Sequence, residues 1–391
     1  MRELKGLNLL ADRSIPTATV LGHGRDADGN RILVLEKIEN AETLSSILTG
    51  TGNAADRIEL LGQTLSLLAQ MHIAGVLQRD LNAGNFLWDG ETVYALDPAQ
   101  MQFFSRPVGR KKSLRQVAHK ATAFLAYDDT VKKELLDVYF QKRGWKLNDA
   151  VIKHIESLAK RARQRIFKRR LKKTLRSCTH FVRQKHDCWC GVFDHHIFKH
   201  QDIDGFMAGI NEAMEAGEIL KRGNTCFVSR IRLDGRDVVV KRYNHKGFWH
   251  SLRYTLKGSR AKKCWLFGHR LKWLGIGVAA PLAFIEQRHC GLIRQSYILN
   301  EMIDGQNIRE HLARPDLDER ARQQIRDKAD ALLSKIAEHR ITHGDLKATN
   351  ILIHNNQPLL IDLDSMKYHR CGWLLKVYQR KMKNKIREQN L

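Results

Sequence analysis

The sequence predicts an α+β fold that is present twice in tandem. Aliphatic runs with a two-residue period predict strands, and apolar residues at steps of three and four predict helices. A polar pattern recurs at a constant offset, since 345 − 80, 350 − 85 and 362 − 97 all give 265. The pairs at this offset are Asp80 and Asp345, Asn85 and Asn350, Asp97 and Asp362, Glu36 and Glu301, and Pro16 and Pro281. An ungapped register over this span indicates an internal duplication.

Composition indicates a folded protein with an anionic partner. At 391 residues, 43% of them hydrophobic, the chain can form two domains with cores of their own. Its net charge of +25 points to nucleic acid, a phospholipid surface or a phosphorylated glycan. We find no apolar run of about eighteen residues that would cross a bilayer. Seven scattered cysteines do not suggest a disulfide framework, so we expect a cytoplasmic protein.

Residues 1–160 are predicted to form the first, incomplete copy of the fold. A strand over 32–38 is followed by a helix over 55–73 whose apolar residues have helical spacing. That helix leads into the polar loop at Asp80. Further helices are expected around 114–125 and 131–140.

Residues 161–200 are predicted to form a basic helical linker. The stretch 161–176 carries a few apolar residues among many lysines and arginines. Such a helix either lies on an anionic membrane surface, clamps a phosphorylated ligand, or is a solvated helix packed on its neighbour. The segment 373–386 is a second basic amphipathic stretch. Nucleic-acid binding is the less favoured alternative, because no recognition motif interleaved with aromatic residues is present.

Residues 201–391 predict the more complete copy. A helix over 203–220 precedes a hairpin over 225–243, whose strands are joined by an Asp-Gly turn. The next helix, over 259–274, carries no acid. A protein kinase would place there the glutamate that pairs with its strand lysine. The segment 221–225 has a single glycine, fewer than a glycine-rich phosphate loop uses.

The motif around Asp345 predicts a phosphoryl-transfer site. An Asp, an Asn five positions later and a second Asp twelve beyond that form the pattern with which protein kinases orient the acceptor hydroxyl and bind Mg²⁺. Asn350 and Asp362 flank a predicted hairpin that would hold them at a fixed separation. Lys241 ends a run of three valines, where kinases place the lysine that contacts the nucleotide phosphates.

These motifs resemble the lipopolysaccharide core kinases of Gram-negative bacteria, the Kdo and heptose kinases. The resemblance is carried by His343-Gly-Asp345, Asp362-Leu-Asp364, Val240–Tyr243, Ser259–Ala261 with Trp265, and Leu274–Pro281. It covers about 223–367 well and 16–99 more weakly. It implies a protein-kinase-like two-lobe fold, with most of the N-terminal lobe missing from the first copy. It also implies ATP- and Mg²⁺-dependent phosphorylation of a heptose or Kdo hydroxyl at the cytoplasmic face of the inner membrane.

The resemblance and the phosphoryl-transfer pattern together assign the site. Asp345 would orient and deprotonate the sugar hydroxyl, and Lys347 would reach the γ-phosphate. Mg²⁺ would bind Asn350 and Asp362. The ATP contacts would come from Lys241 and Glu301. Because Gly344 replaces the arginine that reads a phosphorylated activation loop, we expect constitutive activity.

The first copy offers a second, inactive site. Asp80, Asn85 and Asp97 are present, but no strand lysine or phosphate loop precedes them. Either the chain is truncated at its start, or this copy is a catalytically inactive half that packs on and orients the second. Gln78 in place of His favours loss of activity.

Other functions share the same anchors. A protein Ser/Thr or Tyr kinase, or a small-molecule phosphotransferase of the aminoglycoside type, would carry the same Asp-Asn-Asp pattern. A pseudokinase scaffold in envelope assembly is the non-enzyme alternative, and the missing helix acid favours it. The favoured partner is lipopolysaccharide core or another anionic glycolipid, reached by peripheral contact with the inner membrane.

Overall fold

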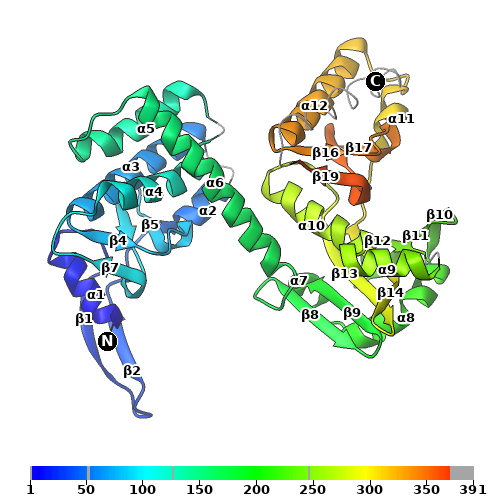
Figure 1. Cartoon of the computed structure of the whole chain (residues 1–391), viewed down its shortest axis with the longest axis horizontal. Helices are drawn as coiled ribbons and strands as arrows, with labels where there is room; N and C mark the ends of the chain where they lie inside the picture. The colour runs from blue at the N-terminus through cyan, green and yellow to red at the C-terminus, as the bar shows by residue number, and fades with distance from the viewer. Residues whose placement is uncertain (1, 51–52, 126, 245–246, 370–391) are drawn as a thin grey trace. The chain divides into compact units, whose positions relative to one another are not determined.

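The structure is a computed structural model that describes residues 2–50, 53–125, 127–244 and 247–369. It divides into two compact units, Met1–Ile166 and Phe167–Leu391. Helix α6 (Asp149–Lys173) leads from the first unit into the second (Figure 1). The predicted basic segment 373–386 lies outside the described residues.

A seven-stranded antiparallel sheet forms one half of the second unit. Its strand order is β10-β11-β12-β14-β13-β9-β8. The strands are β8 (Phe181–His186), β9 (Trp189–Asp194), β10 (Glu218–Arg222), β11 (Cys226–Leu233), β12 (Arg236–Tyr243), β13 (Pro281–His289) and β14 (Leu292–Glu301). The predicted hairpin is confirmed as β11 and β12. Asp234 and Gly235 have positive φ of 47° and 75°, as a two-residue hairpin turn requires.

Two segments of the second unit differ from the sequence prediction. Helix α8 (Ile203–Ala216) ends before Gly217, and residues expected to continue it form the edge strand β10. A Cβ at Gly217 would lie 2.4 Å from the carbonyl oxygen of Arg230, so only glycine lets the chain turn so close to β11. The range 161–200 contains the end of α6 and the hairpin β8–β9, which extends the sheet beside β13.

Helices α9 (Phe248–Lys257) and α10 (Arg260–Trp273) lie between β12 and β13 in sequence (Figure 1). The predicted helix over 259–274 is confirmed as α10, and Ser259 is its N-cap, accepting the N–H of Lys262 at 3.0 Å. Trp265 is fully buried, and its Nε1 donates to the carbonyl of Thr174 at 2.9 Å. The first contact caps the start of α10, and the second ties the helix to the segment between α6 and β8.

The other half of the second unit combines helices with short strands. Its elements are β15 (Gln306–Asn307), α11 (Ile308–Leu312), α12 (Glu319–Glu338), β16 (Ile341–His343), η4 (Ala348–Asn350), β17 (Ile351–His354), β18 (Gln357–Leu360), η5 (Leu363–Ser365) and β19 (Met366–Tyr368). The strands form two small sheets, β15-β17-β18 and β16-β19. This order places the polar residues of the motif in short turns between strands, because η4 follows β16 and η5 follows β18.

The first unit has the same order of elements around its polar loop. Its elements are α1 (Arg2–Ala11), β1 (Val20–Arg25), β2 (Arg31–Leu35), β3 (Glu42–Thr43), α2 (Leu44–Thr49), α3 (Ala54–Ile73), β4 (Val76–Gln78), η1 (Ala83–Asn85), β5 (Phe86–Trp88), β6 (Val93–Ala95), η2 (Pro98–Gln100), β7 (Met101–Phe103), α4 (Arg110–Lys120), η3 (Ala121–Ala123) and α5 (Asp129–Lys142). Sheets β3-β5-β6 and β4-β7 correspond to the two small sheets of the second unit. The helices predicted over 55–73 and 131–140 are confirmed as α3 and α5. The one predicted over 114–125 begins earlier and ends in a 3₁₀ turn.

Backbone hydrogen bonds test the predicted pairing of positions between the units. Glu36 donates its N–H to Thr19 and Glu301 donates to Ala280, both at 2.9 Å, so the two glutamates are equivalent. The predicted equivalence of Pro16 and Pro281 is wrong. Ala95 donates to the carbonyl of Pro16, whereas the equivalent Leu360 donates to Gly277 rather than to Pro281. The loop between these positions and the glutamates differs in length, which the ungapped register does not allow for.

Candidate active site

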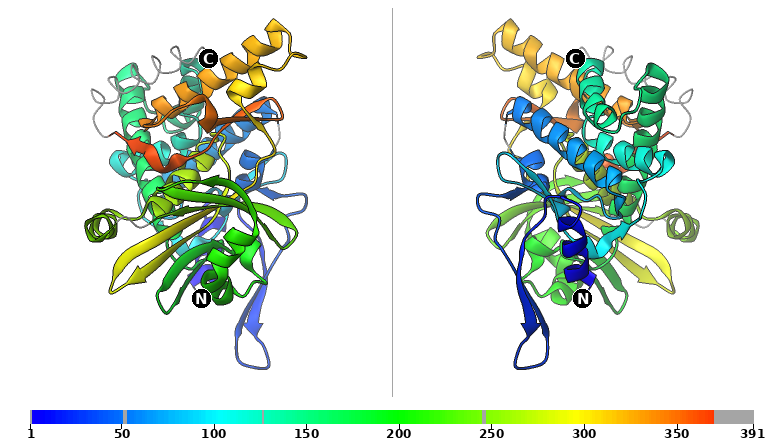
Figure 2. Two further views of the ribbon diagram at one scale, coloured as in Figure 1. Left: turned by 90° about the vertical axis from the view of Figure 1, so that its right-hand side faces the viewer. Right: turned by 90° about the vertical axis from the view of Figure 1, so that its left-hand side faces the viewer.

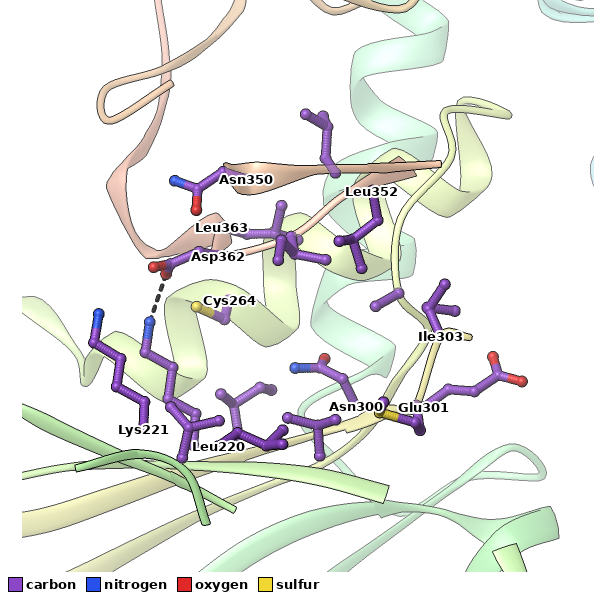
Figure 3. Close-up of a pocket in the computed structure, with 18 of the residues that line it drawn as sticks. Leu220, Lys221, Cys264, Asn300, Glu301, Ile303, Asn350, Leu352, Asp362 and Leu363 are labelled. Atoms are coloured by element: carbon purple, nitrogen blue, oxygen red, sulfur yellow. Dashed lines mark hydrogen bonds and ion pairs between the residues drawn. The ribbon is translucent and has the colours of Figure 1, made fainter. Parts of the chain in front are cut away.

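A cavity of about 460 Å³ lies between the large sheet and the polar turns of the second unit (Figure 3). Four predicted site residues line it: Lys241, Glu301, Asn350 and Asp362. Its remaining walls are mainly apolar, from Val228 and Ile298 on the sheet to Leu352 and Leu360 on the opposite side. An apolar slot with charged groups at one end suits a nucleotide, whose base is flat and whose phosphates are anionic.

Lys241 joins the sheet to the polar turns. Its Nζ lies 2.6 Å from Oδ1 of Asp362, the contact dashed in Figure 3. It also lies 3.8 Å from Oδ2 of Asp364. Burial works to lower the pKa of Lys241, but the two carboxylates outweigh it and raise that pKa above its ordinary value. The ammonium group therefore stays charged, as phosphate binding requires.

Two basic residues of α10, a helix without acidic residues, contact the polar turns. Arg260 forms an ion pair with Asp364, with Nε 3.1 Å from Oδ2, and its guanidinium lies over the ring of Tyr243. Lys263 donates to the backbone carbonyl of Asp364 at 2.6 Å. The helix is thus tied to the segment after β18 by cations instead of being tied to Lys241 by an acid. Sequence reasoning searched α10 for an acid and missed this contact, although Asp364 and the absence of acids were both visible.

The loop after β16 holds Asp345 by backbone contacts. Asn350 donates its Nδ2 to the carbonyl of Asp345 at 2.8 Å, which leaves its amide oxygen on the side of Asp362 (Figure 3). Lys347 Nζ lies 3.0 Å from Oδ2 of Asp345, and both side chains are about half exposed. Neither Asp345 nor Lys347 lines the cavity itself. Both are therefore open to an acceptor arriving from solvent.

A buried histidine supports this loop from beneath. His343 Nε2 lies 3.3 Å from the carbonyl oxygen of Ile361, and its Nδ1 lies 3.2 Å from Oγ of Ser365. Ser365 Oγ in turn accepts the N–H of Asp345 at 3.1 Å. Donation from Nε2 and acceptance at Nδ1 satisfy all three groups with a neutral imidazole. Burial lowers the pKa of His343, which keeps it in that form.

The site of the first unit has the same backbone framework. Asn85 Nδ2 donates to the carbonyl of Asp80 at 3.1 Å, and Gln78 Nε2 reaches the carbonyl of Leu96 much as His343 reaches Ile361. Asp97 and Asp362 share the left-handed conformation, with φ of 55° and 56°. The predicted residues Asp80, Asn85 and Asp97 therefore come together as in the second unit.

The cations around that framework are different. Among the described residues of the first unit, Asp97 has no ion pair, and no strand corresponds to β12 with its Lys241. Lys120 of α4 is buried instead, with its Nζ 3.6 Å from the centre of the Phe86 ring. Burial lowers the pKa of Lys120 to about 7, against the opposing charge of Asp80.

Asn350 and Asp362 fit a magnesium ion. One amide oxygen and one carboxylate at the wall of the same cavity are the hard oxygen ligands that Mg²⁺ prefers, and Mg²⁺ takes most other ligands from water and phosphate. The described residues contain no cluster of three or more His, Cys, Asp or Glu suited to a metal held by protein alone. Within the described part of the chain, no helix is long and apolar enough to cross a membrane.

Comparison with protein-family models identifies one family. The sequence model of the "Lipopolysaccharide kinase (Kdo/WaaP) family" matches residues 1–124 and 211–385, more than half of the chain. A solved structure entitled "WaaP in complex with acyl carrier protein" is similar over 48% of this chain and 78% of its own, with 16% identity and a TM-score of 0.37. A search of curated proteins gives no match.

Proposed function

The chain belongs to the lipopolysaccharide kinase (Kdo/WaaP) family, and we propose that its second unit phosphorylates a heptose or Kdo hydroxyl of the lipopolysaccharide inner core. As a member of that family it is a phosphotransferase with a protein-kinase-like α+β fold, and it uses ATP. The observation that carries the proposal is the convergence of Lys241, Asn350 and Asp362 on one cavity, with Asp345 and its open carboxylate beside it.

The roles of the residues follow from charge and exposure. Lys241 binds the nucleotide phosphates, and Glu301 lies at the other end of the cavity, where the strand β14 ends and the base would bind. Asn350 and Asp362 would hold Mg²⁺, which would neutralise phosphate charge when bound. Asp345 accepts the proton of the sugar hydroxyl, and Lys347 stabilises the transferred phosphoryl group. Phosphoryl transfer of this kind is accelerated mainly by the positioning of the reactants and by electrostatic stabilisation.

The acceptor is an anionic glycolipid, and the protein contacts the cytoplasmic face of the inner membrane to reach it. The net charge of +25 supports this proposal, since lipid and core phosphates are attracted to a basic surface. A protein kinase or a small-molecule phosphotransferase would share the anchors but would not need this charge. A pseudokinase scaffold is disfavoured because the cavity extends without a block from Lys241 to Glu301, where the base would bind.

The two units descend from a duplication, and the first unit no longer transfers phosphate. The matching hydrogen bonds of the two polar loops support a common origin. Among the described residues, Asp97 forms no ion pair, whereas the equivalent Asp362 pairs with Lys241, and this difference supports the inactivity of the first unit. The first unit then serves to support the second.

The test is transfer of labelled phosphate from ATP to a panel of acceptors. Heptose-terminated core glycan, Kdo-terminated core glycan, casein and an aminoglycoside are compared with purified full-length protein and Mg²⁺. We expect label only on a core glycan, at the hydroxyl that mass spectrometry then identifies. Label on casein or the aminoglycoside instead would contradict the proposed substrate, and no label with no ATP binding would contradict the kinase function.

A further inference from the structure

Helix α9 of the second unit has an exposed apolar side. Trp249 and Leu256 are 78% and 79% exposed, more than any other large hydrophobic residue in the described part of the chain. Phe248 is 60% exposed. Tryptophan is normally well buried in a protein. Positions 249 and 256 are two helical turns apart and lie on the same side of α9.

The opposite side of α9 is fixed to the protein. Ser251 is only 2% exposed, and Thr255 Oγ1 accepts the N–H of Ile293 at the start of β14 at 2.9 Å. In Figure 2, α9 is the yellow-green helix that stands out from the side of the large sheet. Its apolar side therefore points away from the unit that anchors it.

A strongly cationic pocket of about 750 Å³ lies between α9 and α10. Six basic side chains line it: Arg253, Lys257, Arg260, Lys262, Lys263 and Arg288. Its two acids are already neutralised within the protein. Glu286 is paired with Arg288 at 2.5 Å and accepts a hydrogen bond from Ser259 at 2.7 Å, and Asp364 is paired with Arg260.

Three of these cations lack partners. The charged side-chain groups of Arg253, Lys257 and Lys262 form no ion pair or hydrogen bond with another side chain among the described residues. Like charges gathered in one pocket repel each other, so a bound anion stabilises the arrangement. Arg253 and Lys257 also lie on the same side of α9 as Trp249 and Leu256, at helical steps of three and four.

We propose that α9 docks the second unit on an anionic membrane, with Trp249 and Leu256 in the headgroup–acyl boundary and lipid phosphates in the cationic pocket. Apolar and basic residues on one exposed helix side are the pattern of helices that lie in a membrane interface. A pocket for soluble phosphate would need the cations but not the exposed tryptophan and leucine. The inference deepens the proposed function, because it names the surface that faces the membrane of a glycolipid acceptor.

Vesicle sedimentation of the full-length protein tests this without ATP. Vesicles of phosphatidylcholine with phosphatidylglycerol are compared with pure phosphatidylcholine. We expect binding to the anionic vesicles only, with roughly a hundred-fold weaker partitioning for Arg253→Gln/Lys257→Gln/Lys262→Gln, since each basic residue near the surface contributes about five-fold. Trp249→Ser/Leu256→Ser should weaken partitioning about ten-fold or more and abolish the blue shift of tryptophan fluorescence.

The matched control is Arg165→Gln/Lys168→Gln/Arg169→Gln, which removes the same charge from an exposed part of α6. We expect it to change partitioning less than three-fold. Loss of binding in this control with none in the α9 variants would overturn the proposal. The proposal would also be overturned if the pocket beside α9 bound inorganic phosphate while none of the α9 substitutions changed binding to vesicles.

The kinase reaction separates this inference from the proposed function. With a deacylated, water-soluble core acceptor, the α9 variants should transfer phosphate as the unaltered protein does, and only the membrane-embedded acceptor should show a defect. If the unaltered protein phosphorylates no core acceptor, the proposed function fails, while the vesicle measurement still decides whether α9 binds membranes.

Discussion

The polar loops of the two units have the same framework and different surroundings. In both, an Asn side chain donates to the carbonyl of the preceding Asp, and a later Asp takes a left-handed backbone. These bonds fold the loop, and they persist in a unit whose described residues form no ion pair with the later Asp. The Asp-Asn-Asp pattern therefore accounts for the shape of the loop, and the cations that face the loop are what differ between the two units.

The largest effect should come from removing Asp345, the proposed general base. We expect Asp345→Ala to lower kcat at least about a thousand-fold, since proton transfer and hydroxyl orientation are both lost. Asp80→Ala, the same change at the equivalent position, should leave kcat within about two-fold. Steady-state phosphate transfer to core glycan measures both. Equal losses in the two variants would show that both loops react, and would contradict the proposed inactivity of the first unit.

Lys241 is the cation that most separates the units. Lys241→Met keeps the volume of the side chain but leaves Asp362 without its 2.6 Å partner and the proposed phosphate site without an ammonium group. We expect kcat/KM for ATP to fall about a hundred-fold. Lys221, which lines the same cavity from β10, offers the matched control, and Lys221→Met should cost less than ten-fold because its side chain is exposed. A larger loss at Lys221 would move the phosphate site to the edge strand.

The contact between α10 and Asp364 should have an intermediate effect, as a positioning contact. Arg260→Ala frees the carboxylate of Asp364, which is only 10% exposed. We expect kcat to fall about ten-fold with little change in KM for the acceptor, and Arg260→Lys to restore part of it. The double variant Arg260→Ala/Asp364→Asn should lose much less than the product of the single losses, because the two residues act as one contact. Independent losses would mean that Arg260 serves another role.

Sequence reasoning found the parts of the site that depend on chain-local patterns. The Asp-Gly hairpin, the helix capped by Ser259 and the spacing from Asp345 to Asp362 are all properties of short segments. The sequence missed β10 and the role of Arg260, which depend on contacts between distant segments. Gly217 ends α8 only because Arg230 on β11 passes close to it. Arg260 matters only because the fold brings Asp364, 104 residues later, to its side.

The buried Lys120 allows a test of how its charge affects the stability of the first unit. Folded Lys120 has a pKa of about 7, against 10.5 when unfolded. Between these values the unfolded chain binds more protons, so the stability of the first unit rises with pH across that window. Below pH 7 the full cost of burying the ammonium group is present.

We expect Lys120→Met to slow amide exchange in α3 and α4 at pH 7 and to remove the pH dependence between about 7 and 10. Hydrogen–deuterium exchange by mass spectrometry measures both in the full chain. Lys112→Met is the matched control, since Lys112 lies on the same helix, is exposed and also stacks on a ring, that of Phe104. A control that stabilises as much as Lys120→Met would show that burial of the charge is not the cause.

The smallest effect is expected when His343, which supports the polar loop of the second unit, is replaced by glutamine, the residue at the equivalent position of the first unit. Because Gln78 already makes the bond to Leu96 that His343 makes to Ile361, His343→Gln should fold normally. It removes the Nδ1 that accepts from Ser365, so the N–H of Asp345 is held less firmly, and we expect kcat to fall about three-fold at pH 7.5. Protonating His343 breaks the same bond. Since burial lowers its pKa below 6.5, the unaltered enzyme should keep its activity through pH 6.5 and lose it only under more acidic conditions. The glutamine variant should lack this acidic loss, and a pH–rate profile that keeps it would assign the titration to another group.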